Sequence, residues 1–290
     1  MNERKINILI YYPSNKPTIA FSTLLPELNK KYKILFLTHL PKEQLHEDLE
    51  KFNIETFIVP ATKLRGILFY LYHVKFLIQF SRQKNIAVIF SHLMPNNIIA
   101  VIAQFFIKSK VVAFRHHFDT AIDNTRKIKW DNEYLGNFII NVLAKKIIVP
   151  CSNVYNGMIK HEFVSTKKLS IIHYYYNFDL YPTPNEIEVK KLKDLFKCKL
   201  LLLFSSRMVP LKRHLVGLKI LKNLIHDGLD VKLLILDNGP EFDNIKQFIY
   251  DHNLDKNAFL IGYTSQIINY IKACDILIHP SLTEASNSKN

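Results

Sequence analysis

The stretch that decides the fold runs from Leu200 to Arg213 and reads Leu-Leu-Leu-Leu-Phe-Ser-Ser-Arg-Met-Val-Pro-Leu-Lys-Arg. Its apolar run predicts a buried strand of a parallel sheet, and a helical pattern begins directly after it. Two cations, Arg207 and Lys212, lie between the strand and the helix. Because α/β proteins bind ligands at the carboxyl ends of parallel strands, this stretch predicts a site for a phosphorylated ligand.

The remainder of this half repeats the alternation of strand and helix. Three further strands are expected at Val231–Asp237, Ala258–Ile261 and Ile276–His279, and helices at His214–Asp227, Glu241–His252 and Ser265–Ala273. The alternation predicts a doubly wound parallel sheet. With four strands, the unit is shorter than such a domain usually is, so we expect it to be incomplete at the C-terminus.

The first half of the chain shows the same alternation. Strands are expected at Ile6–Tyr12, Lys33–Thr38, Glu55–Val59, Ala87–Ser91, Lys110–Phe114, Lys146–Pro150 and Leu169–Ile172. Helices are expected at Ile19–Asn29, Lys42–Phe52, Arg65–Lys84, Pro95–Ile107, Asn132–Ala144 and Asn153–His161. The paired prolines in Pro182-Thr183-Pro184 mark a boundary, because neither can lie inside a helix or a central strand. The sequence thus predicts two Rossmann-like α/β domains, residues 1–182 and 183–290.

Composition is typical of a globular protein, with 48% hydrophobic and 22% charged residues among 290. Three widely separated cysteines lack metal-site spacing and indicate buried, reduced thiols in a cytoplasmic protein. The N-terminus lacks the organisation of a signal peptide. The formal net charge is +14, and most of it belongs to residues 1–150, which hold 21 Lys and Arg against 11 Asp and Glu. Such a field favours an anionic partner, although solvated lysines alone explain much of the excess.

The segment Lys63–Lys84 bears on whether the anionic partner is a membrane surface. Its aromatic and aliphatic residues have basic flanks, which fits an interfacial helix on an anionic membrane surface. It fits a helix that faces the core of an α/β domain at least as well, and we rank that interpretation slightly ahead. Its apolar run is too short to span a bilayer. No signature of nucleic-acid binding is present, so no nucleic-acid partner is expected.

Short motifs follow each predicted strand of the second half. Arg207 and Lys212 follow the first strand, Gly239-Pro240-Glu241 the second, Gly262-Tyr263 the third and Glu284 the fourth. Each motif alone is a common turn. Their order along one carboxyl edge is more specific, because that edge is where open α/β sheets bind ligands.

With these motifs the sequence resembles the GT-B glycosyltransferases of family 4, the glycosyl transferases group 1. The resemblance is strongest over residues 200–288, in Ser-Arg-Met-Val-Pro-Leu-Lys, Leu-Asp-Asn-Gly-Pro-Glu, Leu-Ile-Gly-Tyr and Pro-Ser-Leu-Thr-Glu. Lys145–Ser152 and Tyr176–Asp179 match more loosely, with Phe178 where the family usually has Gly.

The resemblance implies a transfer from a UDP- or GDP-sugar to a lipid-linked or polysaccharide acceptor, with retention, in cell-surface glycan synthesis. Arg207 and Lys212 would hold the donor diphosphate, and Gly239 would lie beside it. Gly262 and Tyr263 would face the base. Glu284 would touch the transferred sugar as the first Glu of the E-x7-E motif. Ser286 and Asn287, in Ala-Ser-Asn where the family commonly has Gly-Phe-Gly, would line the donor site.

The second Glu of that motif would fall two positions past Asn290. The resemblance therefore implies a C-terminally truncated chain, which would lack the ribose contact and the terminal helix and have weak or no activity. No Asp-x-Asp pattern occurs in a suitable loop, so neither a metal nor another cofactor is expected.

Histidines mark the predicted reaction centre in the first domain. His116 follows the strand Lys110–Phe114 and resembles the histidine that lines this centre in the family. At a strand's carboxyl end it could donate a hydrogen bond to a sugar or shuttle a proton. A histidine pair hydrogen-bonded within a loop is the structural alternative. His117 is taken as its neighbour, and Ser91-His92 as a weaker acceptor-side candidate.

Two other functions remain open. A nucleotide-sugar 2-epimerase shares the architecture but needs carboxylates in the cleft, where the first domain offers few beyond Asp119 and Asp123. A non-catalytic basic protein that binds membranes or nucleic acid would explain the charge but not the four ordered motifs. We expect a cytoplasmic enzyme, peripheral on the inner membrane face.

Overall fold

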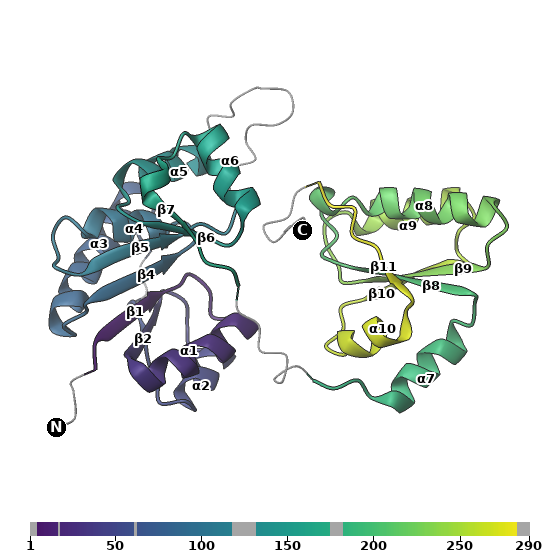
Figure 1. Cartoon of the computed structure of the whole chain (residues 1–290), viewed down its shortest axis with the longest axis horizontal. Helices are drawn as coiled ribbons and strands as arrows, with labels where there is room; N and C mark the ends of the chain where they lie inside the picture. Colours follow the sequence, from purple (N-terminus) through teal and green to yellow (C-terminus); the bar gives the residue numbers. More distant parts are fainter. Residues whose placement is uncertain (1–4, 17, 61–62, 118–131, 175–181, 283–290) are drawn as a thin grey trace. The chain divides into compact units, whose positions relative to one another are not determined.

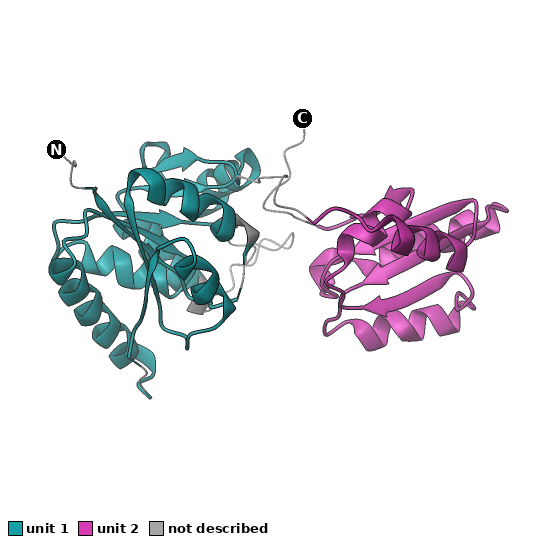
Figure 2. Ribbon diagram, turned by 90° about the horizontal axis from the view of Figure 1, so that it is seen from below, with its two compact units in different colours: residues 1–179, 285–290 teal, residues 180–284 magenta. Residues whose placement is uncertain are grey.

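The protein was analysed as a computed structural model, which describes residues 5–16, 18–60, 63–117, 132–174 and 182–282. The chain forms two compact units, each built on its own parallel sheet (Figure 2). Helices alternate with strands throughout, as the sequence predicts (Figure 1).

The first unit contains a seven-stranded parallel sheet in the order β3-β2-β1-β4-β5-β6-β7. Its strands are β1 (Asn7–Tyr11), β2 (Lys33–Thr38), β3 (Glu55–Ile58), β4 (Val88–His92), β5 (Lys110–Phe114), β6 (Ile147–Val149) and β7 (Leu169–Ile171). The order reverses between β1 and β4. Open α/β sheets bind ligands in the crevice at such a switch point, outside the carboxyl ends of the strands.

Helices cover both faces of this sheet. They are α1 (Ile19–Lys31), α2 (Gln44–Glu50), α3 (Gly66–Gln83), α4 (Asn96–Ala103), α5 (Asn132–Leu143) and α6 (Ser152–Glu162). Alternate residues of a strand point to opposite faces. Accordingly, Ile8 and Ile10 pack in the core with α1 and α2, whereas Leu9 and Tyr11 pack in the core with α3 and α4. A further core beside α4, α5 and α6 contains Ala113.

The second unit contains a four-stranded parallel sheet in the order β10-β9-β8-β11. The strands are β8 (Leu200–Ser205), β9 (Val231–Leu236), β10 (Ala258–Gly262) and β11 (Ile276–Leu277). Helices α8 (His214–His226) and α9 (Phe242–Asp251) cover one face, and α7 (Glu186–Leu195) and α10 (Ile267–Ala273) cover the other. The switch point lies between β8 and β11, so the stretch Leu200–Arg213 leads directly into it.

One helix was absent from the predicted elements. α7 follows the proline pair and begins at Asn185, whose side chain accepts hydrogen bonds from Ile187 N at 3.0 Å and Glu188 N at 3.3 Å. Its composition is mostly charged, and Val189 is its buried residue. Leu192 and Phe196 continue the apolar stripe at helical spacing and pack in the core of this face, so the cap and the pattern together mark the helix.

Helix α3 divides the apolar residues of Lys63–Lys84 between the core and the surface. Its inner face buries Val74, Leu77 and Phe80 in the core. Its first turns nevertheless expose Ile67 and Leu71. Among the described residues, no helix has the combination of length and apolarity that a membrane span requires.

Candidate functional site

The second unit brings the predicted cations to its switch point. Strand β8 ends at Ser205, and the chain continues through exposed Arg207 into the 3₁₀ turn η3 (Pro210–Lys212). Arg213 has a left-handed backbone, with φ of 57°, and lies directly before α8. The half-buried Lys212 therefore lies beside a helix N-terminus. The N–H groups at the start of a helix and the helix dipole favour an anion.

The loop after β9 is fastened to the loop after β8. Met208 N donates to Asn238 O at 3.0 Å, and Glu241 N donates to Met208 O at 3.0 Å. A Cβ at Gly239 would lie 2.3 Å from Met208 O, so only glycine permits this approach of the two backbones. Gly239 thus packs against Met208, and its carbonyl accepts from Phe242 N at 3.1 Å. The contact with Met208 helps to fix the loop that carries Arg207.

The third motif, Gly262-Tyr263, lies at the same carboxyl edge of the sheet. Gly262 has φ of +82°, a conformation that glycine adopts without strain, and its carbonyl accepts from Asp237 N at 2.8 Å. Tyr263 follows with its ring 77% exposed. Both are thus at the carboxyl edge of β10, where a flat ligand could lie against them. Of the remaining predicted residues, Glu284, Ser286 and Asn287 lie outside the described residues, as do Asp119 and Asp123.

Two serines at this edge were not among the predicted site residues. The hydroxyls of Ser206, after β8, and Ser281, after β11, are buried and have no hydrogen-bond partner in the described part of the chain. Strands β8 and β11 pair directly, with Leu203 opposite Leu277. A buried hydroxyl without a partner is costly, and phosphate oxygens would satisfy both. The serines that end the apolar run of β8 were the available signal for Ser206.

The first unit brings the predicted histidines together at the carboxyl ends of β4 and β5, beside its switch point. His92 ends β4, and His116 lies two residues past β5. His92 Nδ1 and His116 Nε2 are 3.2 Å apart, and His116 Nδ1 is 2.7 Å from the hydroxyl of Tyr174. His92 is buried against Phe114, whose ring stacks on it at 4.3 Å between centroids. The sequence placed His92 lower than His116, but the two form one hydrogen-bonded group.

Both imidazoles are neutral near pH 7. Burial lowers the pKa of His92 well below its usual value, and the neighbouring His116 lowers it further. Burial, with a smaller contribution from His117, lowers the pKa of His116 to about 4. A neutral imidazole has one N–H donor and one acceptor nitrogen. Both nitrogens of His116 are engaged by His92 and Tyr174, so neither points freely to a ligand.

A buried ion pair supports the loop that carries His116. Arg115 Nη2 donates to Glu162 Oε1 at 3.0 Å, and both side chains are buried. Asn141 joins the pair, accepting from Arg115 at 3.0 Å and donating to Glu162 at 2.5 Å. These contacts tie the end of β5 to α5 and α6. A pocket of about 320 Å³, lined in part by Arg115, His116 and His117, lies at this edge.

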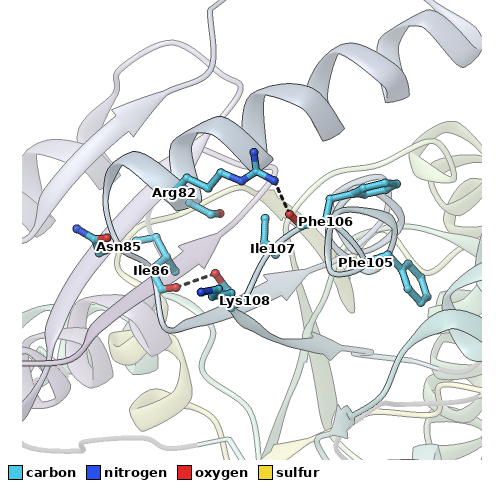
Figure 3. Close-up of a pocket in the computed structure, with 9 residues that line it drawn as sticks. Arg82, Asn85, Ile86, Phe105, Phe106, Ile107 and Lys108 are labelled. Carbon is cyan, nitrogen blue, oxygen red and sulfur yellow. Dashed lines mark hydrogen bonds between the residues drawn. The ribbon is translucent and has the colours of Figure 1, made fainter.

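A larger pocket lies at the opposite edge of this sheet, beside the starts of β4 and β5 (Figure 3). Arg82 Nη2 donates to Phe106 O at 2.8 Å, and Ser109 Oγ donates to Ile86 O at 2.7 Å. Both side chains therefore donate to backbone carbonyls that line the pocket. The amino edge of a parallel sheet is not where α/β folds place their ligand sites, so the carboxyl edges remain the candidate sites.

Comparisons with known proteins give matches in sequence and in fold. Residues 186–286 match the family model "Glycosyl transferases group 1". The chain is 27% identical over 122 residues to the poly(ribitol-phosphate) alpha-N-acetylglucosaminyltransferase of Staphylococcus aureus, and this covers 42% of the chain and 24% of the relative. It is 28% identical over 131 residues, 43% of its length, to the Escherichia coli UDP-Gal:alpha-D-GlcNAc-diphosphoundecaprenol alpha-1,3-galactosyltransferase, of which 34% is covered.

Solved structures extend the likeness to the whole chain. Anabaena HepE, solved with UDP and glucose, superposes with a TM-score of 0.74 at 18% identity, covering 96% of this chain and 75% of that one. A glycosyltransferase from Rickettsia africae superposes with a TM-score of 0.71 at 17% identity, covering 97% and 74%. The fold is therefore the α/β fold of the GT-B glycosyltransferases, and residues 186–286 carry the sequence pattern of glycosyl transferases group 1.

Proposed function

We propose that the protein is a glycosyltransferase of the retaining family 4, which moves a sugar from a nucleotide diphosphate sugar to an acceptor hydroxyl. The observation that carries the proposal is the switch point of the second unit. There, Arg207 and Lys212 lie between β8 and α8, and the buried hydroxyls of Ser206 and Ser281 follow the paired strands β8 and β11, all within the segment that matches glycosyl transferases group 1. Cations, hydroxyls and a helix N-terminus together suit a diphosphate.

The chemistry assigns these residues a role in leaving-group departure. The bond between the anomeric carbon and the diphosphate oxygen breaks, the acceptor oxygen bonds to the same carbon, and the acceptor proton passes to the departing phosphate. Arg207 and Lys212 would stabilise the negative charge that develops on the leaving diphosphate. The residues present thus supply the electrostatic part of the reaction.

Uridine diphosphate is the donor carrier that the comparisons favour. The Anabaena structure holds UDP, and the name of the Escherichia coli relative specifies UDP-Gal and a diphosphoundecaprenol acceptor. By analogy we propose a UDP-sugar donor and an acceptor that is lipid-linked or polymeric, in cell-surface glycan synthesis.

Binding of UDP tests the donor assignment directly. Because the cations would contact the terminal phosphate, UDP is expected to bind at least about tenfold more tightly than UMP, as one charge-assisted hydrogen bond contributes ~1.5 kcal/mol. Titration calorimetry with UDP, GDP and UMP measures the difference. Equal affinity for UDP and UMP, or no binding of either diphosphate, would contradict the proposal.

We further propose that the first unit docks peripherally on the cytoplasmic face of an anionic membrane. Helices α3 and α5 together expose a group of aliphatic and aromatic side chains, here the α3–α5 apolar surface. Its members are between 53% and 74% exposed: Ile67, Leu68, Leu71, Leu135, Phe138 and Val142. A groove of about 660 Å³ adjoins this surface and is lined by residues of α3, α4 and α5. An apolar surface on a unit with a strong excess of lysine and arginine suits an anionic lipid interface.

Vesicle flotation tests this docking. The protein is expected to float with phosphatidylglycerol vesicles, and the double substitution Ile67→Glu with Leu71→Glu is expected to reduce the floated fraction at least tenfold. At each position the variant would lose ~1.5 kcal/mol or more of the free energy gained by burying an apolar side chain in the membrane. The control is Ile187→Glu, at an equally exposed isoleucine of the second unit. Flotation of the double variant equal to that of the control would argue against the docking surface.

A further inference from the structure

The geometry of His92, His116 and Tyr174 differs from ordinary ring stacking. The His92 and His116 centroids are 5.4 Å apart with an interplanar angle of 26°, while their nearest nitrogens are 3.2 Å apart. The His116 and Tyr174 rings are 5.9 Å apart at 9°. Near-parallel planes with a hydrogen bond between ring edges mean that the three rings meet edge to edge. They form one nearly flat row, with His116 in the middle.

The row permits two arrangements of protons. In one, His92 donates to His116 Nε2, and His116 Nδ1–H donates to the Tyr174 oxygen. In the other, Tyr174 O–H donates to His116 Nδ1, and His116 Nε2–H donates to His92 Nδ1. A phenol hydroxyl is a better donor to an imidazole nitrogen than it is an acceptor, and the 2.7 Å separation fits an O–H···N bond. The second arrangement is therefore favoured.

The surroundings of His92 fix its end of the row. Tyr12 and Phe21 meet its ring edge-on at 5.9 and 5.3 Å, and Phe114 stacks on its face. His92 also pairs with Phe114 in the register of β4 and β5. The imidazole thus has a rigid aromatic cage, and its position is set by the sheet rather than by a loop.

We propose that His92 and Tyr174 are positioning residues that hold the His116 imidazole in its Nε2–H tautomer and in a fixed plane. The hydrogen bond made at one ring nitrogen determines which nitrogen carries the proton. His116 would then present the face and carbon edge of its ring to the sugar, instead of a nitrogen. Only this last step rests on the proposed function, because the tautomer is a property of the free protein.

Nitrogen-15 NMR of the imidazoles tests the inference without a substrate. In the unaltered protein, His116 is expected to show one tautomer, with the proton on Nε2. Tyr174→Phe removes only the hydroxyl, and His92→Phe keeps an aromatic ring in the cage, so both are expected to shift His116 toward a mixture of tautomers. Tyr155→Phe, at a half-buried tyrosine of α6, is the control and should leave the His116 signals unchanged.

Two outcomes overturn the proposal: a His116 tautomer that is unchanged in Tyr174→Phe, or a proton on Nδ1 in the unaltered protein. The Tyr174 variant keeps the test valid if His92→Phe fails to fold. Transfer assays then separate the inference from the proposed function. A misplaced His116 is expected to lower kcat, by up to about 100-fold, with little change in KM for the donor. If the NMR result holds and no transfer occurs with any donor, the proposed function fails and the positioning role stands.

Discussion

Alanine at Arg207 or at Lys212 is expected to weaken UDP binding by roughly 10- to 100-fold, because each substitution removes a charge-assisted hydrogen bond that contributes ~1.5–3 kcal/mol. Both side chains extend from the loop between β8 and α8, whose backbone is fixed by Met208 and Gly239. The loss should therefore reflect the missing cation and not a rearranged loop. Titration calorimetry of UDP against each variant measures it.

Lys222→Ala is the matched control, since this lysine is exposed on α8, beyond the turns that adjoin the site. Its affinity for UDP should stay within about twofold of the unaltered protein, because an exposed charge away from the ligand is screened by solvent. An affinity for UDP that is unchanged in the double variant Arg207→Ala with Lys212→Ala would remove the diphosphate site from this edge.

The sequence predicts most of the elements because their patterns are local. The continuous burial of β1 and the apolar run of β8 both follow from a parallel sheet covered on two faces. Predicted and observed bounds differ mainly at ends, as at α4, which stops at Ala103. Asn185 caps the beginning of α7, and Val189, Leu192 and Phe196 follow at helical spacing, although the predicted elements do not include this helix.

In the candidate sites, too, some residues follow from local sequence patterns and others from contacts between distant segments. Arg207 and Lys212 lie in the loop after β8, and Gly262 ends β10, so the strand pattern of the sequence is enough to place all three at the carboxyl edge. Ser206 and Ser281 come to the same sheet edge only because β11 pairs with β8. The row from His92 to Tyr174 joins residues of β4 and of the segment after β7. Such contacts arise from strand order, which a single sequence does not specify. Composition and spacing therefore predict that site residues lie at the carboxyl edge of a sheet, but not which side chains contact one another there.

The buried pair of Arg115 and Glu162 gives the largest expected effect on stability. These residues are far apart in the sequence, and their side chains are 6% and 4% exposed. Glu162→Ala leaves the guanidinium buried without its counter-charge, which costs about 3–5 kcal/mol, a large part of the total stability of a domain. Because the pair joins β5 to α6, the loss should appear in the first unit. Hydrogen-exchange mass spectrometry of β5 and β6 peptides measures it.

An exposed ion pair in the same unit serves as the control, because it has the same charges without the burial. Glu27 contacts Lys30 at 2.7 Å on the surface of α1, and Glu27→Ala should cost no more than about 1 kcal/mol. Peptides of the second unit provide an internal reference, since their core is separate. If Glu162→Ala left exchange in β5 and β6 as slow as Glu27→Ala does, then the pair would not hold the loop of His116. In that case the position of His116 would depend on the row with His92 and Tyr174 alone, and Tyr174→Phe should then also accelerate exchange at the end of β5.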